Sequence, residues 1–130
     1  MNLPSLLRRT LYVLLVLVLA AYVYVYAVLT DGFVRPPEIA RGLPNNFEEA
    51  SLVLEHRLRK KFPEGSSVSQ MIAELKRQGF SVSRVPTTKS DGSASFGKKI
   101  LIGKLIWMVW WRSEQDRIAE LQAYHACICL

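Results

Sequence analysis

The segment His125–Leu130 reads HACICL and holds both cysteines and one of the two histidines of this 130-residue chain. Its last four residues fit the C-a-a-X pattern, in which the first cysteine is prenylated. Thiolates and an imidazole are also zinc ligands, and two cysteines can form a disulfide. The same letters could instead be the end of a β-strand. The choice depends on the side of a membrane on which this segment lies.

Residues 10–29 predict a transmembrane helix, because they form a run of 20 residues without a charge, a proline or a glycine. As a helix this run would span about 30 Å, the thickness of a bilayer's hydrocarbon core. Tyrosines lie near both of its ends, where aromatic belts meet the interfaces. A cleaved signal peptide is the alternative, with small-residue sites at 18–20 and 25–27. The run exceeds the usual apolar region of such peptides, which favours an uncleaved signal anchor.

Basic residues flank the predicted helix on both sides, Arg8 and Arg9 before it and Arg35 and Arg41 after it. The first pair abuts the helix directly, so the positive-inside rule favours a cytoplasmic N-terminus. We therefore expect a single-pass protein of a bacterial inner membrane. Residues 1–9 would be its cytoplasmic n-region, 30–45 a Pro- and Gly-containing linker, and 46–130 a periplasmic domain.

A periplasmic location of the C-terminal segment narrows the possible roles of its two cysteines. Prenylation is cytosolic, and two thiols are only half of a zinc site. Alternate residues of a regular strand lie about 6–7 Å apart, which would strain a bond between Cys127 and Cys129. The end of a strand is the favoured interpretation, and a disulfide stays open if the compartment is oxidising. We expect no metal and no cofactor.

The predicted domain opens with two amphipathic helices. Asn46 can cap the first helix, and Ser67 can cap the second one, which Gly79 would end in the left-handed conformation. Helical spacing aligns the apolar residues Phe47, Ala50, Leu54, Leu58 and Phe62 on the first helix and Val68, Met71, Ile72 and Leu75 on the second.

Residues 80–85, 98–112 and 117–129 read as three strands. Between them we expect a polar loop at 86–98 and a turn at 113–116, with Gly103 as a bend and a bulge near Glu120. The fold class is therefore α+β: an N-terminal transmembrane helix, then an α-α-β-β-β domain with a three-stranded antiparallel sheet.

Three tryptophans on the second predicted strand are candidates for partner binding. Alternation places Trp107 and Trp111 on one face and Trp110 on the other, so at least one should lie on the face without helices. Exposed tryptophan is typical of binding hot spots. The alternative is that each ring closes the edge of a small core.

The net charge of +6 falls to +4 when Arg8 and Arg9 are set aside as membrane flank, a mild excess that would permit, without demanding, attraction to anionic lipid or an acidic protein. Arg57, Lys60 and Lys61 crowd the end of the first domain helix and form a second candidate patch for a partner. Solvated charges at a helix end are the alternative interpretation. A basic patch interleaved with aromatic residues is lacking, so we expect no nucleic-acid partner.

The histidines His56 and His125 have no nucleophile or metal set within reach by sequence, and we therefore predict neither an enzyme nor a small-molecule substrate. The run FPEGSSVSQMIAELKRQGF, followed by a Trp-containing hairpin, loosely resembles the two-helix, three-strand module of small β-barrel assembly lipoproteins and of β-lactamase inhibitory protein. The matching residues are Gly65, Ser66, Ser67, Val68 and Met71. This resemblance implies a module that binds proteins through its sheet or loops.

The function that these observations favour is a membrane-anchored protein-binding module, with an immunity or inhibitor protein against an envelope-acting toxin or enzyme as one form of it. The alternative is an accessory or structural subunit of an envelope complex that acts partly through its transmembrane helix. The predicted partners are the lipid bilayer, through residues 10–29, and another protein.

Overall fold

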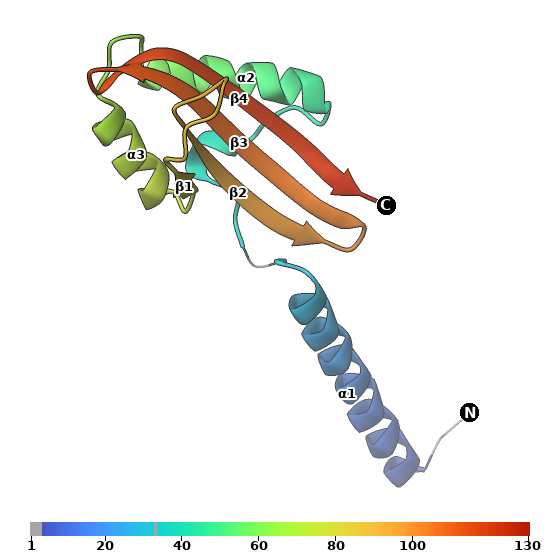
Figure 1. The fold of residues 1–130 in the computed structure, drawn as a ribbon. Helices are drawn as coiled ribbons and strands as arrows, with labels where there is room; N and C mark the ends of the chain where they lie inside the picture. The colour runs from blue at the N-terminus through green and yellow to red at the C-terminus, as the bar shows by residue number, and fades with distance from the viewer. Residues whose placement is uncertain (1–3, 33) are drawn as a thin grey trace.

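The structure is a computed structural model that describes residues 4–32 and 34–130. Figure 1 shows a long helix projecting from an α+β domain. This helix, α1 (Ser5–Leu29), has no buried residue, and it is long and apolar enough to cross a membrane. It begins five residues before the predicted span and so takes in most of the predicted n-region, of which residues 1–3 lie outside the described residues.

The second half of the segment predicted as a linker packs onto the domain. It contains a 3-10 helix, η1 (Glu38–Ala40), whose Ile39 and Ala40 are buried. The Ile39 N–H donates to Gln78 Oε1 at 2.9 Å, and Arg57 Nη1 donates to the carbonyl oxygens of Ile39 and Arg41 at 3.1 and 2.6 Å. Backbone and side-chain bonds therefore join this segment to both domain helices.

Helices α2 (Phe47–Lys61) and α3 (Val68–Arg77) begin directly after their predicted caps, and α3 ends before Gly79 as predicted. Asn46 Oδ1 accepts hydrogen bonds from the N–H groups of Glu48 and Glu49, and Ser67 Oγ accepts one from Gln70. Beyond α3, Gly79 has a φ of +95°, a left-handed conformation that costs glycine least. These local bonds satisfy helix-end groups that would otherwise lack partners.

The sheet has four antiparallel strands in the order β1-β2-β3-β4, and the predicted number of three is wrong. The strands are β1 (Ser81–Ser83), β2 (Gly92–Ile100), β3 (Gly103–Glu114) and β4 (Arg117–Cys129). The predicted loop 86–98 contains most of β2, and the predicted bend at Gly103 is the start of β3. Leu101 and Ile102 form the turn between these strands, although neither is a typical turn residue.

The hairpin of β3 and β4 closes through Gln115 and Asp116, whose φ values of 51° and 62° are those of a type I′ turn. The Asp116 carboxylate accepts hydrogen bonds from Ser67 Oγ and Ser69 Oγ at 3.2 and 2.9 Å, which ties the turn to the start of α3. The register shifts opposite Arg112 and Ser113, so β4 contains the bulge predicted near Glu120.

Both domain helices pack on one face of the sheet, α2 mainly against β4 and α3 against β1. The apolar stripes predicted for them are buried against the sheet with one exception. Phe47, predicted as a member of the first stripe, is 42% exposed, because it lies in the first turn of α2 at the edge of the core. Fully buried members include Leu54, Leu58, Met71, Leu75 and Val109. The opposite face of β3 and β4 carries the side chains that alternate with these core residues.

Candidate protein-binding face

The sheet face turned away from α2 and α3 is called the open face below, and its centre is apolar. It comprises Ile106, Met108, Trp110, Tyr124 and Ala126. Strand alternation places these residues opposite the buried Trp107, Val109 and Trp111. Four of them are partly exposed, and Tyr124 is 46% exposed. This surface therefore presents a continuous apolar strip to the surroundings.

Trp110 and Tyr124 form the aromatic part of this strip. Their ring centroids lie 6.2 Å apart, with the planes inclined at 39°. The two residues come from adjacent strands, because Met108 pairs with Tyr124 and Trp110 with Gln122. Tryptophan and tyrosine are the residues most enriched in binding hot spots, where a large rigid ring enters a partner's pocket.

A hollow of about 400 Å³ lies beside Trp110, between Gln122 and the loop that joins β1 to β2. Arg112 holds this loop in place by donating from Nε to the Lys89 carbonyl and from Nη2 to the Thr88 carbonyl, each at 3.0 Å. These bonds therefore fix the second half of the loop, next to β2, to β3. A partner side chain would find the hollow already formed, which lowers the entropic cost of binding.

Positive charge lies at both ends of the open face. Lys99 and Lys104 pair across β2 and β3 at the end near α1. Lys89 and Arg112 lie at the other end, where Glu120 is 3.6 Å from the Arg112 guanidinium. The end with Lys89 and Arg112 is therefore of mixed charge, because Glu120 and Asp91 lie there as well, whereas the end near α1 carries lysines.

The structure separates the three candidate tryptophans as alternation predicts. Trp107 and Trp111 are each only 3% exposed and belong to the core, so they do not present a contact surface. The Trp107 ring stacks on His125 at 4.8 Å, and its Nε1 has no hydrogen-bond partner among the described residues. Trp110 is left as the tryptophan of the open face.

The basic candidates lie on α2, away from the open face. Arg57 is engaged by backbone carbonyls, and Lys61 Nζ lies 3.0 Å from Glu74 Oε1, whereas Lys60 is exposed. Hydrogen bonds from Arg77, and to a smaller extent from Gln78 and Lys61, hold the pKa of Glu74 well below its usual value. Two of the three basic candidates thus make contacts that join elements of the domain.

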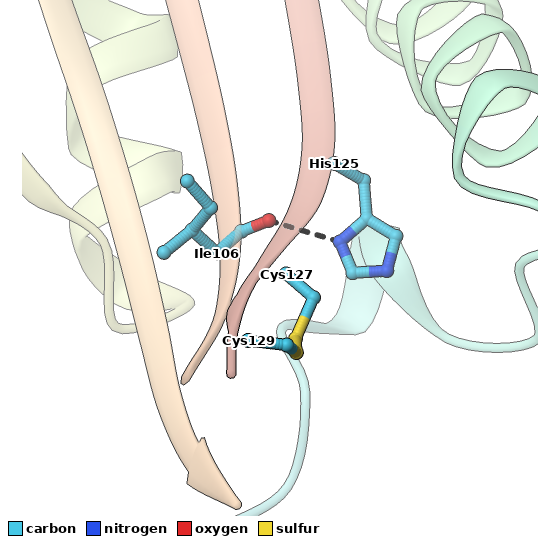
Figure 2. The surroundings of a disulfide bond; sticks show 4 residues. All are labelled: Ile106, His125, Cys127 and Cys129. Atoms are coloured by element: carbon cyan, nitrogen blue, oxygen red, sulfur yellow. Dashed lines mark hydrogen bonds between the residues drawn. A yellow bond between two sulfur atoms is a disulfide. The ribbon is translucent and has the colours of Figure 1, made fainter. Parts of the chain in front are cut away.

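The cysteines end β4 as predicted, and they are also joined as a disulfide (Figure 2). Their Cα atoms lie 5.3 Å apart, closer than alternate residues of a regular strand, which is why the pairing is compatible with the strand end. His125 Nδ1 lies 2.9 Å from the Ile106 carbonyl oxygen and must donate to it, because a carbonyl only accepts. The described residues contain no group of three His, Cys, Asp or Glu side chains that could hold a metal ion.

Sequence reasoning missed Tyr124, Gln122 and the loop wall as members of the site. The position of Tyr124 and Gln122 depends on the pairing of β3 with β4 and on the bulge that shifts it, and the loop wall is held by Arg112. No protein-family model, characterised protein or solved structure matches this chain. The open face is therefore the feature on which a functional assignment rests.

Proposed function

We propose that this chain is a membrane-anchored, non-enzymatic module that binds another protein through its open face. The observation that carries the proposal is Trp110 on the open face, beside Tyr124 and the preformed hollow. The other two tryptophans lie in the core, so this ring is an exception that core packing does not explain. Residues of this kind supply most of the binding energy in protein interfaces.

The anchor in this proposal is α1, with its N-terminus in the cytoplasm and the domain in the periplasm of a bacterial cell. Arg8 and Arg9 next to the apolar segment support this orientation. An immunity or inhibitor protein is the form of module that fits best. Such a protein needs a compact domain, one binding surface and a tether that holds it where the toxin or enzyme arrives.

The partner should present an apolar patch rimmed by acidic residues. Lys89 and Arg112, at the end of the open face away from α1, would attract such a partner and would make its association rate depend on salt. Raising the ionic strength should therefore slow association more than it speeds dissociation.

The test is an affinity capture from solubilised envelope and from candidate toxins, with the full-length protein as bait. The wild type is compared with Trp110→Ala and with Lys60→Ala, a matched change of an exposed residue on α2. We expect one stoichiometric partner that Trp110→Ala loses and Lys60→Ala keeps. A partner that binds all three proteins equally would overturn the assignment of the open face.

The alternative is an accessory subunit of an envelope complex that acts through α1. It is favoured by the exposure of this helix, because no residue of α1 is buried and its whole surface is available to other membrane helices. Replacing residues 10–29 by an unrelated membrane helix distinguishes the two functions. Loss of the partner after this exchange, together with its retention by Trp110→Ala, would favour the accessory subunit.

A further inference from the structure

The end of the sheet next to α1 carries exposed apolar side chains that are not part of the core. Leu101 and Ile102, in the turn between β2 and β3, are 68% and 59% exposed, and Ile128 of β4 is 65% exposed. The Leu130 N–H donates to the Ile102 carbonyl oxygen at 2.9 Å, which brings a further exposed leucine alongside. These four residues are called the apolar tip.

The apolar tip lies beside the point where the chain leaves α1. The Asp31 N–H donates to the Lys99 carbonyl oxygen at 3.1 Å, and Asp31 Oδ2 accepts from the Lys99 N–H at 2.8 Å. This pair of bonds joins the exit of α1 to β2, two residues before Leu101. At the rise of a strand, the turn is about 7 Å further along. Figure 1 shows the same arrangement, with the end of this hairpin directed toward the α1 side of the domain.

Basic residues lie directly behind the apolar tip. Lys98 and Lys99 precede the turn on β2, and Lys104 follows it on β3. The acidic residue that bonds to this part of β2 is Asp31. Its carboxylate accepts from the Lys99 backbone N–H and does not pair with a lysine ammonium. Apolar side chains backed by lysines match the layers of a bilayer surface, which are acyl chains followed by anionic headgroups.

We infer that the apolar tip inserts into the surface of the same bilayer that α1 spans, with the three lysines among the headgroups. This inference rests on the proposed anchoring by α1. A helix that crosses the hydrocarbon core ends at the surface of the bilayer, and the Asp31 bonds keep the tip at that level. Lipid is the favoured occupant because of this placement and because of the positive charge behind the tip.

The experiment uses the full-length protein in nanodiscs that contain about 30% anionic phospholipid, so that the surface potential attracts lysines. A photoreactive benzoyl-phenylalanine is placed at Ile102, and lipid adducts are counted by mass spectrometry after illumination. The matched control places it at Val85, which is 71% exposed in the loop near the opposite end of β2. Leu101 is the second site for the label if the Ile102 protein does not fold.

We expect lipid adducts at Ile102 to exceed those at Val85 by at least about fivefold, because an inserted apolar side chain contacts acyl chains continuously. Changing the three lysines to glutamate should lower the adducts in anionic nanodiscs much more than in zwitterionic ones. Equal adducts at the two positions, or adducts to another protein or a second copy, would overturn the inference.

A label at Tyr26 on α1 separates failure of the tip from failure of the anchor. Lipid adducts at Tyr26 without adducts at Ile102 would refute the tip and leave the anchor standing. A lack of adducts at both positions would refute the anchoring itself, and the inference about the tip with it.

Discussion

Trp110 and Trp111 are neighbours in sequence, and their replacement by alanine should have opposite consequences. Trp111 is 3% exposed, and its ring covers Gly92 in the core. Trp111→Ala should lower the free energy of unfolding by about 3–5 kcal/mol, the cost of emptying a tryptophan site in a core. Trp110 is partly exposed on the open face, so Trp110→Ala should cost no more than about 1.5 kcal/mol.

These magnitudes can be resolved, because a small domain is stable by only about 5–15 kcal/mol in total. The assay is urea unfolding of the full-length protein in detergent, followed by the fluorescence of the two remaining tryptophans. Binding should show the reverse order. Trp110→Ala should weaken the partner complex by about 2 kcal/mol or more, which is about thirtyfold in Kd.

Trp107→Ala is the control, because Trp107 lies on the same face as Trp111 and is equally buried. It should lower the unfolding midpoint about as much as Trp111→Ala does. If Trp110→Ala instead matched the two core variants, another layer would have to cover the open face. That result would refute the argument for a binding surface.

Three further predictions concern other parts of the domain. Gly92→Ala should destabilise the fold, because the new β-carbon would clash with the Trp111 ring, lying only 2.9 Å from its Nε1. A lowered midpoint of thermal unfolding checks this prediction. The lowered pKa of Glu74 stabilises the fold fully above its ordinary value of 4.5, and this contribution is lost as the pH falls toward the folded-state pKa. The stability difference between wild type and Glu74→Gln should therefore shrink between pH 6 and pH 3, and a constant difference in urea titrations would contradict this. The disulfide closes a very short loop, so the Cys127→Ser/Cys129→Ser double variant should lose less than about 2 kcal/mol of unfolding free energy. A larger loss in urea titrations would show that the disulfide does more than restrict the unfolded chain.

The helices could be predicted because their signals are local. Asn46 and Ser67 cap backbone N–H groups two or three residues away, and Gly79 needs only its own left-handed conformation. The apolar stripes follow from the same short-range spacing. Each of these features depends on a few neighbouring residues, which a sequence displays directly.

Strand β2 could not be predicted, because its residues 92–99 are mostly glycine, serine and lysine, which have low strand propensity. Pairing with β3 along its whole length stabilises it, and that pairing is a tertiary contact. The turn between β2 and β3 could not be predicted either, because its residues have high strand propensity. Leu101 and Ile102 look like the middle of a strand, and only the pairing of Ile100 with Gly103 shows that the chain reverses there.

The candidate site was predictable in part. Alternation separates Trp110 from Trp107 and Trp111, but it does not say which side the helices cover. The position of Tyr124 beside Trp110 depends on the bulge in β4, because without that extra residue the outward and inward residues of the strand would exchange faces.

Under the inferred insertion of the apolar tip, the length of β3 sets the distance between the lipid and Trp110 on the open face. Trp110 lies eight positions after Ile102, so an upright strand would hold this ring at most about 27 Å above the inserted turn. Electrostatic screening at physiological ionic strength acts over about 8 Å, and the membrane's charge would therefore be hardly felt at that height. A freely diffusing partner could dock without touching lipid, whereas a partner fixed to the same membrane would need a stalk of comparable length.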